Sequence, residues 1–183
     1  MGELKVKTTK RFFILVGVFI SLAYLCTEGH AQSKGSAPVI TFAWAQDRIR
    51  QGEDWRIYIA ANDPDGDMYR IYCRIDQPGG QVYRPDVSSI KKGLEGQLTG
   101  YLVLRTYSPQ DLFGLYLTLN LTIVDRAGNE SQTYSFPLTI DGEKTKFPPQ
   151  GLIPAGLEKG LNQRISYIGI DLMRRDRLGG GGD

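Results

Sequence analysis

Histidine and cysteine are almost absent from this chain of 183 residues, which contains one histidine and two cysteines. His30 and Cys26 fall within the first 31 residues, so the rest of the chain has no histidine and one cysteine, Cys73. These absences exclude Ser-His-Asp and Cys-His catalysis, the usual His-containing zinc sites and a CxxC redox pair from that part. A single thiol forms no internal disulfide. We expect Cys73 to be a small buried apolar residue, with an intermolecular disulfide as the alternative.

Nucleotide-binding motifs and an excess of charge are also missing. The sequence has no GxGxxG pattern and no phosphate-binding loop. Residues 1–31 hold four of the 22 Lys and Arg residues and two of the 20 Asp and Glu residues, which leaves 18 of each sign in the remainder. This balance gives no reason to expect a nucleic-acid partner. Paired carboxylates would still allow glycosidase chemistry, but Asp and Glu lie mostly in predicted turns, so we do not expect an enzyme.

The N-terminal 31 residues have the layout of a secretory signal peptide. Four basic residues precede an apolar run of 15 residues, Phe12–Cys26, and the small residues Gly29 and Ala31 follow it. The run is shorter than the ~20 residues of a membrane-spanning helix. Cleavage after Ala31 is therefore favoured over the alternative, an uncleaved membrane anchor. We expect an exported protein, periplasmic or extracellular, in which residues 32–37 are a polar spacer.

The clearest periodicity lies in the segment Gly114–Asn129. Leucine or isoleucine occupies every second position from Leu115 to Ile123, and mostly polar residues stand between them. Such alternation places the apolar set on one face of a β-strand. The turn residues Asp125–Asn129 end this strand, and a second alternating run, Ser131–Ile140, completes a predicted hairpin.

Further runs rich in β-branched and aromatic residues precede this hairpin, with turn residues between them. These runs are Pro38–Trp44, Trp55–Ala61, Tyr69–Asp76, Leu98–Tyr107 and a short edge segment, Gln81–Arg84. The residues predicted to face the core are Trp55, Ile57 and Ile59 in one run, and Tyr69, Ile71, Cys73 and Ile75 in another. About seven short strands without a long helix predict an all-β, antiparallel sandwich over residues 38–141.

Several turn motifs occur in a recognisable order along this segment. They are Gly52-Glu53, Asp63-Pro64-Asp65-Gly66-Asp67, Gly114-x-Tyr116 and Asp125-x-x-Gly128-Asn129. In their order and spacing they resemble bacterial immunoglobulin-like modules, and they are close in pattern to the PKD, cadherin-like and fibronectin type III-like domains of secreted proteins. The resemblance implies an immunoglobulin-like β-sandwich with a non-catalytic role in protein interaction or structural support at the cell envelope. The implied partner is another envelope or secreted protein. Alternatives are a carbohydrate-binding module and, less favoured, a small secreted hydrolase.

Tyr116 departs from the pattern of these families. There the equivalent tyrosine points inward, whereas Tyr116 is out of phase with the leucines. Gly114 and Asp125 are also eleven residues apart, one more than the usual pattern. One extra residue in the strand explains both observations, so we predict a β-bulge between Tyr116 and Thr122. The alternative is a regular strand with Tyr116 on the solvent face.

Four tyrosines on strand faces opposite the apolar set are candidates for a binding surface. They are Tyr58, Tyr72, Tyr101 and Tyr107. Cross-strand aromatic pairs stabilise sheet surfaces without any ligand. The functional alternative is a flat platform for a sugar or a protein. Both interpretations stay open at this point.

An acidic turn at residues 62–67 is the candidate metal site. In an immunoglobulin-like sandwich this turn and the loop after residue 124 emerge at the same end, which brings four carboxylates together. They are Asp63, Asp65, Asp67 and Asp125. Converging oxygens suit Ca²⁺, which takes six to eight oxygen ligands, and the run resembles the acidic loops of cadherin-like domains that bind Ca²⁺. The favoured alternative is turn chemistry alone, in which Asp side chains hydrogen-bond their own backbone. No other cofactor is expected.

The composition changes after Asp141. Residues 142–153 carry lysines and a Pro-Pro pair and are predicted to be a linker. Residues 154–178 contain apolar residues spaced four, four, three and four apart, as on one face of an amphipathic helix. These are Leu157, Leu161, Ile165, Ile168 and Leu172. Two glycines weaken the helix, and residues 165–173 are equally compatible with a strand.

A helix here would need a partner surface, because an isolated helix of this length is marginal. That surface would be the sandwich, another subunit or a membrane. Membrane contact would place Arg174, Arg175 and Arg177 at lipid head groups. The alternative is a disordered tail, and we expect disorder for residues 179–183 in either case.

Overall fold

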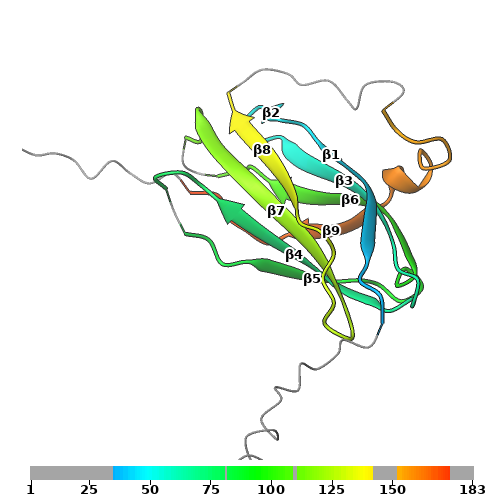
Figure 1. Cartoon of the computed structure of the whole chain (residues 1–183). Coiled ribbons are helices and arrows are strands. Elements are labelled where there is room, and N and C mark those ends of the chain that lie inside the picture. The colour runs from blue at the N-terminus through cyan, green and yellow to red at the C-terminus, as the bar shows by residue number, and fades with distance from the viewer. Residues whose placement is uncertain (1–34, 81, 109–110, 142–151, 174–183) are drawn as a thin grey trace, which may run out of the picture. The chain divides into compact units, whose positions relative to one another are not determined.

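The structure is a computed structural model that describes residues 35–80, 82–108, 111–141 and 152–173. The predicted signal peptide, residues 32–34 of the spacer, residues 142–151 of the linker and residues 174–183 lie outside these described ranges. Two β-sheets face each other in a sandwich (Figure 1). Within the described ranges, none of the helical structure is long and apolar enough to cross a membrane.

Nine strands form the two sheets in the described part of the chain. Sheet A has the order β1 (Val39–Ala45), β3 (Asp54–Asn62), β6 (Gln97–Arg105) and β9 (Arg164–Ile168). Sheet B has the order β2 (Arg48–Ile49), β8 (Tyr134–Ile140), β7 (Leu115–Asp125), β4 (Met68–Asp76) and β5 (Asp86–Ser89). Neighbouring strands are antiparallel, except for the β2–β8 and β6–β9 pairs, which are parallel. The predicted immunoglobulin-like sandwich is confirmed, with β2 and β9 as additional strands that pair in parallel.

The core lies between the sheets and follows the alternation of the sequence. All five apolar side chains from Leu115 to Ile123 in β7 are buried. Opposite them in sheet A, Trp55, Ile57 and Ile59 of β3 are fully buried. The indole N–H of Trp55 donates to the Gln46 carbonyl (2.7 Å), so its polar atom is satisfied inside the core.

The β-bulge predicted between Tyr116 and Thr122 is wrong. Strand β7 pairs with β8 in unbroken register from Leu115 to Leu121, and Tyr116 is 48% exposed. A bulge occurs instead in the pairing of β7 with β4, where Tyr69 of β4 is the extra residue between Met68 and Arg70. It shifts the phase of β4 by one residue, so Met68 is buried, and Tyr69, predicted for the core face, is only partly buried.

The predicted edge strand Gln81–Arg84 is also displaced. The edge strand beside β4 in sheet B is β5, which begins at Asp86. The described residues just before β5 are irregular, and Tyr83 among them is buried. Its hydroxyl lies 2.7 Å from Gln77 Oε1 and 3.0–3.1 Å from the backbone oxygen and nitrogen of Met173.

The helix predicted over residues 154–178 is wrong within the described range. A single 3₁₀ turn, Gly160–Asn162, precedes strand β9, which pairs with β6. Ile165 and Ile168 of β9 enter the core between the sheets, as do Ile170 and Leu172 beyond it. These side chains fill the side of the sandwich between β5 and β6, where they are more deeply buried than they would be in a helix on the surface. The free energy of this burial decides the conformation against the helix that the spacing predicts. Residues 174–178 lie outside the described ranges.

Gly100 of β6 is the residue that lets this segment approach. The Tyr101 N–H donates to the Gln163 carbonyl (2.9 Å) just before β9. A Cβ at Gly100 would collide with that carbonyl oxygen and lie 2.8 Å from Ile165 Cγ1. The absence of a side chain at this position therefore allows the backbones to meet.

Candidate functional site

Two loops at one end of the sandwich bring the predicted acidic residues together. Between β3 and β4, the side chain of Asp63 is buried and accepts hydrogen bonds from the N–H groups of Asp65 (3.2 Å) and Asp67 (3.1 Å). At the end of β7, Asp125 is buried and accepts hydrogen bonds from both the N–H and the side-chain amide of Asn129 (2.7 Å each). Each loop thus uses an Asp side chain to hold its own backbone.

The two loops are joined by one backbone hydrogen bond, from the Arg126 N–H to the Asp67 carbonyl (3.1 Å). Burial raises the pKa of Asp67, and a hydrogen bond with Asp63 raises it further, as do the charges of Asp125, Asp63 and Asp65. Oδ1 of Asp67 is buried without a hydrogen-bond partner. Asp67 therefore favours its protonated form more than an exposed aspartate does.

This arrangement fits a hydrogen-bonded pair of turns better than a metal site. In the described ranges no three Asp, Glu, Cys or His side chains are placed to hold one metal ion. Both oxygens of Asp63 and both of Asp125 already accept hydrogen bonds within their loops. Calcium binding by Asp63, Asp65, Asp67 and Asp125 stays a prediction.

The four candidate tyrosines do not share one surface. Tyr58 is on the outer face of sheet A, as predicted, but it is buried, not exposed. It packs in a second apolar cluster with Phe42 and Leu161, which Tyr101 borders. Tyr72 lies on sheet B, and Tyr107 is 86% exposed in the loop after β6. Apolar residues of the segment 152–161 cover Tyr58, although they lie about a hundred residues later in the sequence. The local alternation of β3 therefore does not predict that Tyr58 is buried.

Cys73 is a free thiol buried in the core, which confirms its prediction as an apolar residue. Burial raises the pKa of this thiol, and the charge of Asp86 raises it further. A thiol in this state is a poor nucleophile.

A cleft that the sequence did not reveal lies at the opposite end of the strands. Its volume is about 260 Å³, and it lies between the turn after β4 and the start of β7. Its lining residues are Gln77, Pro78, Gly79, Gly80, Gly114, Leu115 and Tyr116. We call this surface, together with Phe113, the end surface. The two glycine-rich turns Gln77–Gly80 and Phe113–Gly114 were its only sequence signal, and their proximity depends on strand pairing.

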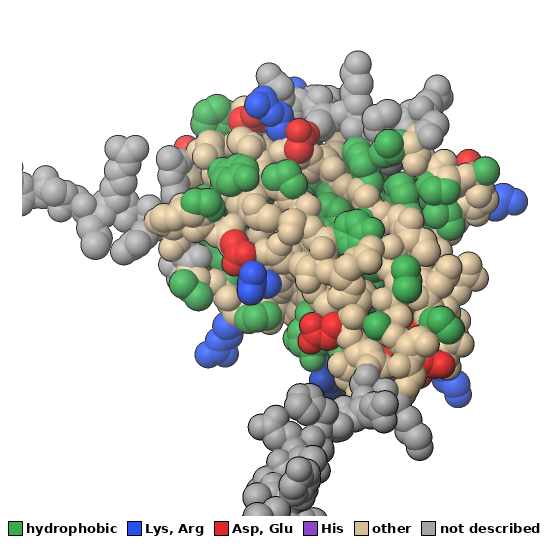
Figure 2. All heavy atoms as spheres, in the orientation of Figure 1, with side chains coloured by type: hydrophobic (Ala, Val, Ile, Leu, Met, Phe, Trp, Pro, Cys, Tyr) green, Lys and Arg blue, Asp and Glu red, His purple; other side chains and the backbone are tan. Residues whose placement is uncertain are grey.

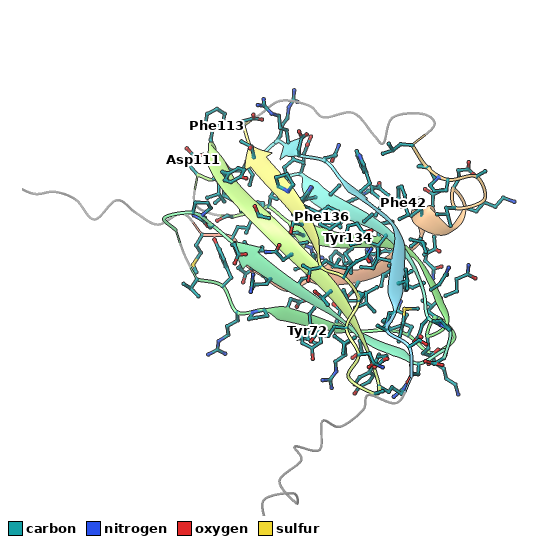
Figure 3. The ribbon with its side chains drawn as sticks, viewed as in Figure 1. Phe42, Tyr72, Asp111, Phe113, Tyr134 and Phe136 are labelled. Carbon is teal, nitrogen blue, oxygen red and sulfur yellow. The ribbon has the colours of Figure 1, made fainter. Side chains whose placement is uncertain are left out.

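Of the two aromatic side chains of the end surface, Tyr116 lies on strand β7 and Phe113 lies in the turn before it. Phe113 is 57% exposed, and its N–H donates to Asp111 Oδ1 (2.9 Å). Gly114 adopts a positive φ of 75°, which turns the chain into β7, and its N–H donates to the Ile140 carbonyl (2.6 Å). Figure 3 shows Phe113 and Asp111 at this end of β7.

No protein-family model matches the chain, and no curated protein matches it. Among solved structures, the chain is similar to the PKD domain of an M14-like peptidase from a Thermoplasmatales archaeon. The sequences are 15% identical, and the TM-score is 0.37. The match covers 59% of this chain and 99% of that domain.

Proposed function

We propose that the chain is an exported, non-catalytic immunoglobulin-like module that binds another envelope or secreted protein through its end surface. The signal-peptide layout of residues 1–31 supports export to the periplasm or the cell exterior, with a membrane-anchored form as the alternative. The immunoglobulin-like sandwich supports a role as a rigid carrier of binding loops. Membrane contact through residues 174–177 would bring the module close to its partner at the envelope.

The observation that carries this proposal is the pair of exposed aromatic side chains beside a cleft. Phe113 is 57% exposed and Tyr116 is 48% exposed, although aromatic side chains gain free energy from burial. Aromatic residues are enriched at the centres of protein interfaces, where a few of them supply most of the binding energy. A partner side chain inserted between Pro78 and Tyr116 would bury the Tyr116 ring.

The glycines of the cleft favour a polypeptide partner over a small molecule. Gly79, Gly80 and Gly114 expose backbone without a side chain, and Leu115 is the first residue paired in β7. The cleft is open to solvent, and small-molecule sites usually enclose most of the ligand surface. Backbone groups together with flanking aromatic rings suit an extended segment of another protein.

Affinity capture with matched variants tests the proposal. Full-length protein, Phe113→Ser/Tyr116→Ser and Tyr72→Ser/Val87→Ser would be incubated with native envelope extract, and each captured protein would then be purified and titrated by calorimetry. The control pair also removes one aromatic and one apolar side chain, from paired positions of β4 and β5. We expect the end-surface variant to lose at least about tenfold in affinity, as for loss of an interface hot spot. A partner that binds both variants and the wild-type protein equally would contradict the proposal.

A further inference from the structure

The outer face of sheet A carries three arginines around one valine. Across the strands, Arg56 of β3 and Tyr167 of β9 both pair with Val103 of β6, and Arg164 pairs with Tyr101. Arg105 lies two residues beyond Val103 on the same face. We call Arg56, Tyr101, Arg105, Arg164 and Tyr167 the arginine face.

The guanidinium groups of this face are stacked on tyrosine rings. The Cζ atoms of Arg105 and Arg164 lie 4.2 and 4.3 Å from the centre of the Tyr167 ring. Arg56 Cζ lies 5.1 Å from the centre of the Tyr101 ring. These cation–π contacts fix the positions of the head groups while leaving N–H donors at their edges.

Val103 shows how closely this layer is packed. Its side chain points away from the core, yet it is only 2% exposed. The neighbours that the strand register places around it are the arginines and tyrosines of this face. They therefore cover it, and the surface above Val103 consists of guanidinium and aromatic groups.

The three positive charges lack carboxylate partners among the described residues. Elsewhere in that part of the chain, Arg48 pairs with Asp141 (3.0 Å) and Arg74 with Asp76 (3.1 Å). On the arginine face the one acid in register is Asp54, opposite Arg105, and no ion pair joins them. By contrast, the side of the molecule in Figure 2 has interspersed acidic and basic side chains.

We propose that the arginine face binds an acidic polysaccharide through the carboxylate or sulfate groups of the polymer. Guanidinium groups form bidentate hydrogen bonds with such oxyanions. The face spans three strands, so it offers several contacts to a repeating polymer. This site is separate from the end surface and does not depend on it.

Two other anionic partners fit the face less well. An acidic peptide gains affinity by adding to a sheet edge, but Arg56 and Arg105 lie on β3 and β6, which are paired with neighbouring strands on both sides. An anionic membrane would favour exposed apolar side chains for insertion, and Val103, the aliphatic residue at the centre, is covered. A sheet face that acts only through side chains suits a polymer with regularly spaced charges.

Binding of two defined polymers to the full chain tests this site. Polygalacturonate and dextran sulfate would be the probes, neutral dextran the blank, and calorimetry at two salt concentrations the measurement. The variant Arg56→Gln/Arg105→Gln/Arg164→Gln removes the three charges. Arg84→Gln/Lys91→Gln/Lys92→Gln removes three charges from exposed positions outside the face. Circular dichroism would confirm that both variants are folded.

We expect the arginine-face variant to bind at least one polymer tenfold or more weakly than wild type, and the control to lose less than twofold. Arg164→Lys should lose severalfold, because it keeps the charge but not the fork of donors. Equal loss in both triple variants, or no binding of either polymer by wild type, would overturn the proposal. Equal or tighter binding of polyglutamate or phosphatidylglycerol vesicles would also overturn it, since the face would then recognise an acidic peptide or a lipid surface.

Discussion

Asp67 is the residue at which burial and negative charge conflict most directly. Its Oδ1 atom is buried without a hydrogen-bond partner, and three further carboxylates act on it. Its pKa in the folded protein is therefore raised, whereas in the unfolded chain it lies near ~3.9. The stability that this proton supplies is fully present below the unfolded pKa and is lost as pH rises through the folded pKa.

The variant Asp67→Asn should remove this pH dependence. We expect it to be more stable than wild type at pH 7 by less than about 1 kcal/mol, because the group is partly exposed and solvent screens it. In urea denaturation, the wild-type free energy of unfolding should fall from pH 4 upward relative to the variant. Identical pH profiles for the two proteins would show that Asp67 titrates in the same way in both states.

Calcium titration separates the two interpretations of the same turns. We expect millimolar Ca²⁺ to leave the melting temperature unchanged, because the Asp63 and Asp125 oxygens already hold backbone and amide N–H groups. Differential scanning fluorimetry measures this directly. A rise in wild type that is absent in Asp65→Asn/Asp67→Asn would establish the calcium site instead.

At the scale of single strands, the face assignment of β7 gives a sharp prediction. Leu119 is fully buried at the centre of the strand, and the neighbouring Thr118 is only partly buried. Leu119→Asp should cost more than about 4 kcal/mol, since it buries an unpaired charge. Thr118→Asp should cost about 1 kcal/mol, mainly through repulsion from Asp76 opposite it. Similar urea midpoints for both variants would contradict this assignment.

Gly100 connects the sheet to strand β9. Gly100→Ala places a methyl group against the Gln163 carbonyl and Ile165, so β9 should be held less tightly. Hydrogen exchange should accelerate at the amides of residues 164–168, while the β4–β7 pair stays protected. Uniform acceleration across both sheets would mean that the methyl group disturbs the whole domain and not this junction.

Strand β7, which has one buried face, is predictable from the sequence because its alternation records burial directly. Alternation predicts Tyr69 on the core face, but the bulge in β4 changes the phase of the strand at this residue. The amino-acid composition gives no sign of such a bulge. The apolar spacing of residues 165–172 also fits a helix. The sequence does not show the space between the two sheets that these side chains fill, so it could not decide against the helix. The acidic turns carry local signals, whereas Tyr58 and the end surface depend on segments far apart in sequence.

At the scale of the whole molecule, the C-terminal segment is part of the core and not an appendage. Ile165, Ile168, Ile170 and Leu172 are each at most 6% exposed, and Leu161 packs on the outer face of sheet A. Full burial of one such side chain contributes about 1.5–3 kcal/mol. Their total is comparable to the roughly 5–15 kcal/mol of net stability typical of a domain.

A chain that ends at Gly151 should therefore be severely destabilised or unfolded. Where it still folds, we expect a lower urea midpoint and a lower slope of free energy against urea, because less apolar surface is exposed on unfolding. A chain that ends at Met173 is the matched control and should unfold like the full-length protein. If the Gly151 truncation melted at the wild-type temperature, residues 152–173 would contribute nothing to the fold, and the packing of β9 against β6 would be wrong.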